Sequence, residues 1–235
     1  MALVEEAAAL RRAGIDAPIL VLSEPRPDEM AEVAALGLRA TVYTAAGIAA
    51  AAATGAPLRL HLKVDTGMHR VGAAPEAVPR LAEAVVAAPS LVLEAVWTHC
   101  AVADEPERPF TSEQLERLDA VLAELAAAGI EVPMVHAANS AGAIAHPSAR
   151  RSLVRCGIAV YGIDPSPELA GALPLRPALR LRSAVSFVKP VAAGEGVSYG
   201  LRHTFTEDTA VATVPIGYAD GVRRRLGLLG QEVLI

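Results

Sequence analysis

The sequence predicts an α/β protein: a (β/α)8 TIM-like barrel that lacks its first two strands, followed by the start of a mostly β C-terminal domain. Six apolar, strand-like runs alternate with helical segments, a pattern typical of βα units on a parallel sheet. The chain opens on a helical segment with no strand before it. After residue 175 the helical segments stop and short strand-like runs follow one another. We therefore expect two domains, residues 1–175 and 176–235.

The predicted strands are short apolar runs that end at polar residues or glycine. Their spacing of about 30 residues matches the length of a βα unit. A doubly wound open sheet is the alternative architecture, because periodicity alone does not show whether a parallel sheet closes into a barrel. The six predicted strands cover residues 18–24, 40–44, 58–64, 91–98, 133–138 and 152–162.

The clearest predicted helix covers residues 112–128. Thr111 and Gln114 have the spacing of a capping box at its start, and Gly129 stands where a helix ends. Leucines recur at helical spacing and predict one buried face. These leucines are Leu115, Leu118, Leu122 and Leu125.

The C-terminal region reads as antiparallel strands joined by glycine-rich turns, with no helix between them. The runs that predict it are residues 175–191, "GVSYG" and "TAVATVPIGYADG". The last four residues, "EVLI", form a strand-like run without a partner in the sequence. Because an unpaired apolar edge favours aggregation, we expect the natural chain to continue.

Composition indicates a globular protein that binds a small molecule. The chain is 53% hydrophobic and 20% charged, and its formal net charge is −5. Nucleic acids and anionic membranes are bound through clusters of basic residues, so this charge argues against both partners. Cys100 and Cys156 form no disulfide framework and have no zinc-site spacing, so we predict no metal. The N-terminus lacks the features of a signal peptide, which favours a cytoplasmic protein.

Polar residues gather where the predicted strands end. In barrels of this type the working residues stand at the C-terminal ends of the strands. Each alone is compatible with a structural role, and the set together indicates a site. Ser140, at a strand-to-helix turn before Ala141 and Gly142, offers a hydroxyl and backbone N–H groups that suit a phosphate. The set comprises Lys63, Asp65, Arg70, His99, His136, Asn139, Ser140, Arg155, Gly157 and Ile158.

With these residues in place, the chain resembles alanine racemase, a family that uses pyridoxal 5′-phosphate to interconvert L- and D-alanine for peptidoglycan. The resemblance runs the whole length, and several motifs in one order make it specific. It implies a barrel, a C-terminal β domain and a homodimer whose active sites take residues from both subunits. The motifs are "LKVDTGMHRVG", "THCAVADE", "HAANSAG", "VRCGIAVYGIDPSP", "GEGVSYG" and "PIGYADG".

The resemblance also implies residue roles. Tyr199 matches the tyrosine base that takes a proton from L-alanine across the dimer interface. Arg155 matches the residue that donates to the pyridine nitrogen, and a guanidinium there leaves the ring a weaker electron sink, because it does not give up its proton. The other matches to cofactor contacts are His99, Asn139, Ser140, Gly157 and Ile158, with His136 as a supporting neighbour.

Lys63 has a different implied role. From position alone, one of only two lysines at a strand end would be nominated as the Schiff-base lysine. The resemblance instead makes Lys63 a residue that is often carbamylated. The resulting anion would orient Arg70, which reaches the cofactor and the substrate carboxylate through bidentate geometry. An ordinary ion pair between Lys63 and Asp65 is the structural alternative.

The family's Schiff-base lysine stands in a "KANAYGHG"-type motif that these 235 residues do not contain. Racemisation needs two acid/base groups, and only the tyrosine is present. We therefore expect a segment of an alanine racemase, truncated at both ends and without appreciable activity by itself. Two alternatives stay open: a non-catalytic relative that binds the cofactor or a partner, and a racemase of another small amino acid such as serine.

Overall fold

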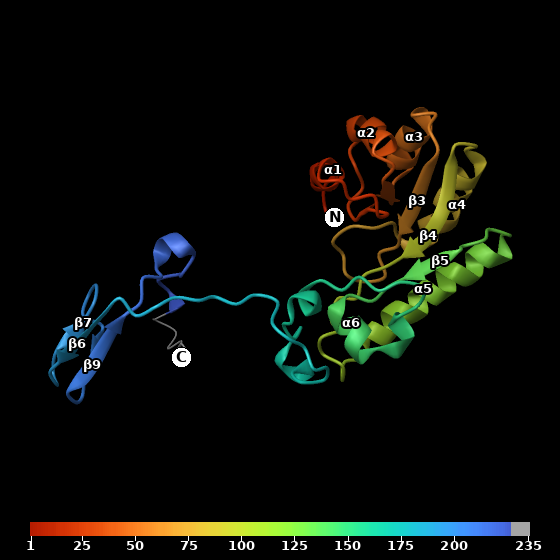
Figure 1. Cartoon of the computed structure of the whole chain (residues 1–235). Coiled ribbons are helices and arrows are strands. Elements are labelled where there is room, and N and C mark those ends of the chain that lie inside the picture. Colours follow the sequence, from red (N-terminus) through yellow and green to blue (C-terminus); the bar gives the residue numbers. More distant parts are fainter. Residues whose placement is uncertain (227–235) are drawn as a thin grey trace. The chain divides into compact units, whose positions relative to one another are not determined.

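A five-stranded parallel sheet forms the centre of the first part of the chain (Figure 1). The computed structural model describes residues 1–226 and divides the chain into two units, Met1–Ala178 and a second that starts at Leu179. All strand pairs of the sheet are parallel. The strands are β1 (Leu20–Val21), β2 (Arg39–Val42), β3 (Leu58–Lys63), β4 (Leu91–Trp97) and β5 (Met134–His136).

The strands lie side by side in sequence order, β1-β2-β3-β4-β5. A doubly wound sheet requires a point at which the strand order reverses, and this sheet has none among its five strands. The architecture is therefore that of a half-barrel. Five of the six predicted strands are confirmed, although β1 is shorter than the predicted residues 18–24.

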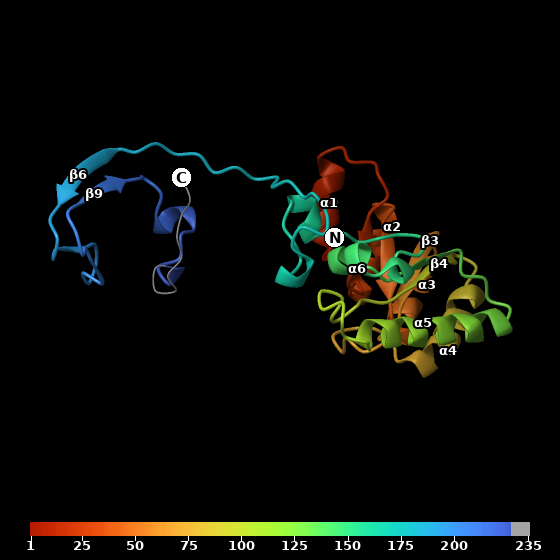
Figure 2. The same ribbon diagram turned by 90° about the horizontal axis from the view of Figure 1, so that it is seen from below.

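Helices follow the same sequential order as the strands. Contacts join α2 to α3, α3 to α4 and α4 to α5, and α4 also packs on β3 and β4. Figures 1 and 2 show α4 and α5 side by side. No helix among residues 1–226 is long and apolar enough to cross a membrane. The helices are α1 (Val4–Arg12), α2 (Met30–Ala35), α3 (Ala45–Ala53), α4 (Val78–Ala87), α5 (Phe110–Ala127) and α6 (Ser140–Ala145).

Strand β3 shows that the sheet has two different faces. Leu58, Leu60 and Leu62 alternate with Arg59, His61 and Lys63, and successive side chains of a strand point to opposite faces. The leucines belong to the apolar core together with buried residues of α4. We call the side of the sheet that carries these leucines the helix-facing face, and the side that carries Arg59, His61 and Lys63 the inner face.

A β-bulge interrupts the pairing of β3 with β4. Leu60 pairs with Leu93 and His61 pairs with Ala95, so Glu94 is an extra residue in β4. A bulge of this kind redirects side chains locally. The Glu94 carboxylate lies 2.9 Å from His61 Nε2 and 2.6 Å from Arg39 Nε. The bulge thus brings an acidic group to the inner face.

Helix α5 confirms the predicted helix, but its predicted cap is wrong. The helix begins at Phe110, so Thr111 lies inside it, and the Thr111 hydroxyl is buried without a hydrogen-bond partner in the described part of the chain. Gln114 is also fully buried and bonds to residues outside the helix. The capping box fails because tertiary contacts, rather than the helix terminus, use the Gln114 side chain.

The sixth predicted strand, residues 152–162, is also wrong. Leu153 makes only an isolated parallel bridge to His136, and Ile158–Tyr161 form a 3-10 helix. The physical reason lies at Ser140, whose Oγ accepts the N–H of Gly157 at 2.9 Å and that of Ala159 at 3.3 Å. The backbone therefore turns toward the Ser140 hydroxyl instead of extending the sheet.

The second unit contains two small antiparallel pairs, as the sequence predicted for a β region. Residues 179–186 precede them without regular structure, and the predicted strand in "GVSYG" ends in a turn after Val197. The predicted strand "EVLI" lies outside the described residues. The pairs are β6 (Phe187–Val191) with β9 (Thr209–Thr213) and β7 (Gly196–Val197) with β8 (His203–Thr204).

Candidate active site

A cavity of about 340 Å³ lies in the first unit, within the size range of small-molecule sites. Its walls come from the segments that follow β4 and β5 and from residues 155–158. All six residues predicted to contact a cofactor line it, together with Asp104, Ala141 and Pro165. The six are His99, Asn139, Ser140, Arg155, Gly157 and Ile158.

Arg155 is the most strongly held side chain of this cavity. Its Nη1 donates to His136 Nδ1 at 2.6 Å, and its Nη2 lies 2.8 Å from the carbonyl oxygens of Thr98 and Ala137 and 3.1 Å from His99 Nδ1. The guanidinium also stacks over the Trp97 ring at 4.5 Å. Burial lowers the pKa of Arg155 to about 10, so it stays a cation at neutral pH.

Positive charge dominates the surroundings of His99. Burial and, to a smaller extent, the charges of Arg155, Arg70 and Lys63 lower the pKa of His99 to about 4. His99 is therefore neutral at pH 7, and its Nδ1 accepts from Arg155. A site with several cations and a neutral imidazole favours an anionic ligand.

The segment around Ser140 suits a phosphate. The Ser140 hydroxyl is the shared acceptor for the N–H groups of Gly157 and Ala159, so these donors converge on one point of the cavity wall. Converging backbone N–H groups form an anion-binding concavity. Asn139 is already engaged, since its Oδ1 accepts from Gly142 N and its Nδ2 donates to the Cys100 carbonyl. Asn139 therefore supports the wall.

Lys63 is buried at the end of β3, with its Nζ 4.4 Å from the centre of the Trp97 ring. Burial lowers its pKa to about 8, and the charges of Arg70 and Arg155 act in the same direction. Asp65 does not form the alternative ion pair with Lys63. Among the described residues its carboxylate instead accepts the N–H groups of Gly67 and His69 and lies 3.3 Å from His69 Nδ1.

Arg70 stands on a loop that leaves β3 and returns to it. Asp65 N donates to the Ala73 carbonyl, and Ala73 N donates to the Lys63 carbonyl, which closes the neck of the loop. Gly72 has φ 135°, and a Cβ there would lie 2.8 Å from Asp65 N, so only glycine fits this neck. Arg70 itself is exposed.

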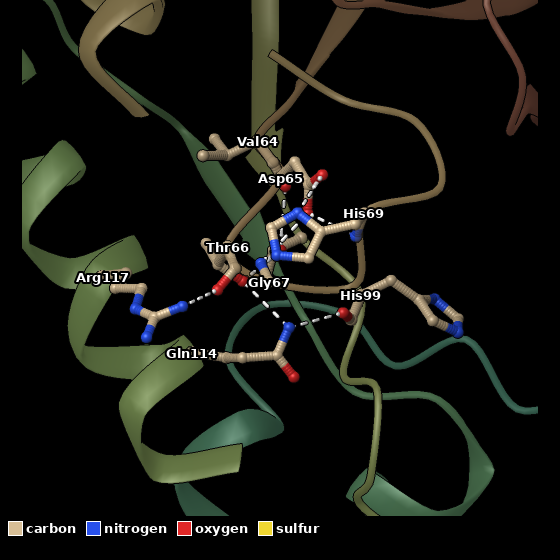
Figure 3. Close-up of polar contacts among 9 residues, drawn as sticks. Val64, Asp65, Thr66, Gly67, His69, His99, Gln114 and Arg117 are labelled. Carbon is tan, nitrogen blue, oxygen red and sulfur yellow. Dashed lines mark hydrogen bonds and ion pairs between the residues drawn. The ribbon is translucent and has the colours of Figure 1, made fainter. Parts of the chain in front are cut away.

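Helix α5 fixes the first part of this loop, as Figure 3 shows. Gln114 Nε2 donates to Thr66 Oγ1 and to the His99 carbonyl, and Gln114 Oε1 accepts from Ala101 N. Arg117 Nη1 donates to the Thr66 carbonyl at 2.8 Å. Gln114 thus joins the segment after β3 to the segment after β4, a connection that the sequence did not indicate.

Sequence reasoning also missed His61, Glu94 and Trp97. Burial of both faces makes most parallel strands continuously apolar, so the alternation of leucine with arginine, histidine and lysine in β3 was a signal for a polar inner face. No comparable signal marks Glu94, because its position depends on the bulge.

Tyr199 belongs to the second unit, and its side chain is 77% exposed. It stands in a tight turn in which Leu201 N donates to the Ser198 carbonyl. Ser198 and Leu201 have positive φ values of 62° and 45°, which is uncommon for residues other than glycine. The Tyr199 side chain is therefore exposed on a turn whose backbone conformation is uncommon for residues other than glycine.

Comparison with known protein families matches both parts of the chain. The alanine racemase N-terminal domain matches residues 1–165, and the alanine racemase C-terminal domain matches residues 178–235. The chain belongs to the alanine racemase family. This finding confirms the resemblance that the motifs carried.

Curated alanine racemases are similar over the whole chain. The protein of Symbiobacterium thermophilum is 45% identical over 238 residues, which cover 100% of this chain and 63% of that relative. The protein of Desulfovibrio desulfuricans is 38% identical and is covered to 64%. The chain thus spans a little less than two thirds of the length of these relatives.

Solved alanine racemases have the same fold. The E. faecalis structure superposes with a TM-score of 0.86 at 40% identity, covering 96% of this chain and 62% of that one. The Bacillus anthracis structure with bound L-Ala-P has a TM-score of 0.82 at 37% identity and is covered to 60%. A Clostridium difficile 630 structure in complex with cycloserine has a TM-score of 0.80 at 33% identity, covering 95% of this chain and 59% of that one.

Proposed function

We propose that this chain supplies the pyridoxal 5′-phosphate cavity of an alanine racemase that interconverts L- and D-alanine and provides D-alanine for peptidoglycan. The observation that carries the proposal is the convergence of all six predicted cofactor residues on one cavity. The cavity fits an anionic, planar cofactor, because it combines cationic side chains with converging hydroxyl and N–H groups.

Each part of the cavity has a proposed task. When bound, pyridoxal phosphate stabilises the negative charge that develops at the substrate Cα as its proton leaves. Ser140, Gly157 and Ile158 hold the phosphate. Arg155 donates to the pyridine nitrogen without giving up its proton, and neutral His99 and His136 keep the guanidinium in place.

Lys63 and Arg70 form the substrate side of the proposed site. A lysine with a lowered pKa is partly uncharged near neutral pH, and the uncharged amine is the form that reacts with CO2 to give a carbamate. Carbamylation would place an anion among Arg70 and Arg155, where the structure has an excess of cations. Arg70 then binds the substrate carboxylate through two N–H groups.

Tyr199 is the proposed base that takes the Cα proton of L-alanine. We place it in the active site of a partner copy, so the working enzyme is a homodimer. Racemisation also needs a proton donor on the opposite face of the Cα. The only lysines of these 235 residues are Lys63 and Lys189, and neither is proposed for that task. We therefore propose that the chain alone has no appreciable racemase activity.

The same cavity favours a second function for the chain as it stands: cofactor binding without catalysis. Its walls need no residue outside the first unit. Two free cysteines are compatible with the reducing cytoplasm, the compartment we propose.

Titration of the chain with pyridoxal phosphate, followed by absorbance and tryptophan fluorescence, tests the proposed cavity. Saturable binding is expected, and Ser140→Ala weakens it, whereas Ser112→Ala on the exposed side of α5 leaves it unchanged. Borohydride reduction followed by mass spectrometry shows whether Lys63 is attached to the cofactor, and we expect no attachment. No saturable binding, or equal binding by Ser140→Ala, contradicts the proposal.

Substrate preference is tested in the full-length enzyme that contains this chain. D-alanine and D-serine formation are measured side by side from the two L-amino acids. Preferred formation of D-alanine is expected, and D-serine as the main product would assign the chain to a serine racemase.

A further inference from the structure

Four side chains form a chain of hydrogen bonds across the inner face of the sheet. Arg155 Nη1 lies 2.6 Å from His136 Nδ1, and His136 Nε2 lies 2.9 Å from His61 Nδ1. His61 Nε2 in turn lies 2.9 Å from Glu94 Oε2. Both histidines are buried, at 0% and 2% exposure. We call Arg155, His136, His61 and Glu94 the inner-face relay.

Every bond of the inner-face relay has one possible direction. A guanidinium only donates, so His136 Nδ1 accepts and the proton of this neutral ring is on Nε2. His136 Nε2 therefore donates to His61 Nδ1, and the His61 proton is also on Nε2. That proton is donated to the Glu94 carboxylate, which only accepts when ionised. The two ends of the relay thus determine both tautomers.

An additional proton would break the relay. If His61 carried protons on both nitrogens, His136 Nε2 would have to accept, and the His136 proton on Nδ1 would face the Arg155 N–H. Burial lowers the pKa of His136 to about 2 and also lowers that of His61, so both rings stay neutral. The charged groups near the two rings are Glu94, Arg39 and Arg155, and Arg59 lies 3.4 Å from Glu94.

The bulge in β4 is the device that places the acceptor end of the relay. Glu94 is the extra residue between Leu93 and Ala95, and its Oε2 accepts from both His61 Nε2 and Arg39 Nε. Without an acceptor at this point, a proton on His61 Nε2 has no partner in the relay, and only the N–H of His136 opposes its transfer to His61 Nδ1. A proton on His61 Nδ1 would face the His136 proton on Nε2.

We propose that Glu94 is a positioning residue for Arg155: as the acceptor at the end of the inner-face relay, it fixes the two histidine tautomers that hold the Arg155 guanidinium toward the cavity. The inference rests on the proposed function only in the use of Arg155 by the cofactor. Nη1 makes one bond among the described residues, which leaves its second hydrogen for a ligand. The relay thus determines which guanidinium N–H group meets a ligand.

The unaltered chain, labelled with ¹⁵N-histidine, tests the relay directly. Two-bond ¹H–¹⁵N correlation spectra distinguish the two neutral tautomers and the imidazolium. Both His61 and His136 are expected as neutral rings with the proton on Nε2, unchanged from pH 5 to pH 9. Either ring with its proton on Nδ1, or protonated at pH 7, overturns the proposal.

Two variants of Glu94 distinguish the effect of its hydrogen-bond acceptor from the effect of its side-chain volume. Glu94→Gln keeps an acceptor oxygen, so the spectra of His61 and His136 stay as in the unaltered chain. Glu94→Leu has similar size but no acceptor, and a second His61 tautomer is expected, with a changed His136 signal. Backbone amide spectra verify that each variant is folded. A folded Glu94→Leu variant with both tautomers unchanged contradicts the proposed role.

Pyridoxal phosphate binding links the relay to the cavity. Glu94→Leu is expected to bind the cofactor about tenfold more weakly than Glu94→Gln, the lower end of what loss of outer-shell partners costs at metal sites. Equal affinities would overturn the effect on Arg155. If the unaltered chain binds no cofactor, the proposed function fails, while the histidine spectra still decide whether the relay exists.

Discussion

The two faces of the parallel sheet differ in composition although the same strands build them. On the helix-facing face of β3, Leu58, Leu60 and Leu62 are fully buried in one apolar core. On the inner face, His61 and Lys63 are equally buried, yet they lie among charges and hydrogen bonds. Burial alone therefore does not define the core of this protein. Apolar packing on the helix-facing face stabilises the fold. It offsets the cost of removing the polar groups of the inner face from water.

The largest change in the free energy of unfolding is expected from a variant on the helix-facing face. Leu62→Ala removes a fully buried side chain and leaves a cavity, so the free energy of unfolding falls by about 2–5 kcal/mol. Urea unfolding measures it. Val92→Ala, in the neighbouring strand and 46% exposed, is the control and changes stability by less than about 0.5 kcal/mol. Equal losses would mean that the two faces do not differ in this way.

A smaller loss of stability is expected from a variant of Gln114, which connects α5 to the segments that follow β3 and β4. Gln114→Leu leaves the N–H of Ala101 without its acceptor and removes two donated bonds, so stability falls by about 1–3 kcal/mol. Hydrogen exchange of the amides at residues 98–101 also increases. Glu116→Leu makes a similar change at an exposed position of α5 and is the control. An unchanged exchange rate would remove Gln114 from the support of the site.

Lys63 gives the inner face a dependence on pH. Its pKa is about 8 in the folded chain instead of the ordinary 10.5, so the unfolded chain binds more protons between these values. Stability therefore rises with pH across that window, and the penalty of the buried charge is fully present below pH 8. Lys63→Met is more stable than the unaltered chain at pH 7, and this advantage disappears toward pH 10.5.

Lys189→Met in the exposed strand β6 is the matched control for this pH dependence. The Lys189 side chain is exposed, so its charge keeps its hydration and this variant is expected to gain no comparable stability at pH 7. A Lys63→Met advantage that is also constant from pH 7 to pH 10.5 would show that the ammonium is solvated in the folded chain.

The smallest effect concerns a buried hydroxyl of β2. Thr41 is fully buried, and its Oγ1 has no hydrogen-bond partner among the described residues. Thr41→Val is expected to leave stability unchanged or raise it by about 1 kcal/mol or less, because no hydrogen bond is lost and a desolvated hydroxyl is removed. Thr98→Val is the contrast. The Thr98 hydroxyl bonds to the Val64 carbonyl and to Thr66, so this variant is expected to be destabilised. Thermal unfolding of the two variants and the unaltered chain measures both effects.

Most of the fold was predictable because the helix-facing face follows simple periods. The runs that became β2, β3, β4 and β5, and the leucines of α5, are patterns that burial on one side imposes. The sixth strand was not predictable in this way, because the competing acceptor, Ser140, stands seventeen residues before Gly157. Apolar composition at residues 158–161 favours a strand and a 3-10 helix alike.

Six of the predicted site residues line one cavity, whereas the contacts that hold them were not predictable. Motif similarity pointed to six residues, and the structure places all six in the wall of one cavity. The relay that holds Arg155 depends on a one-residue bulge and on side chains from three strands. Gln114 had a local explanation as part of a cap, and only the packing of α5 against the segments after β3 and β4 reveals its bonds. Long-range polar contacts of this kind leave little trace in sequence periodicity.

The sequential strand order also affects how the first unit assembles during synthesis. Each strand of the sheet pairs only with its predecessor and its successor, so the sheet can grow strand by strand as the chain leaves the ribosome. The relay bonds run from Glu94 of β4 and His61 of β3 through His136 of β5 to Arg155, and Arg155 emerges last of the four. The apolar layer and the bond between His61 and Glu94 can therefore form early, whereas the bonds of His136 and Arg155 complete the relay only after these residues have been translated.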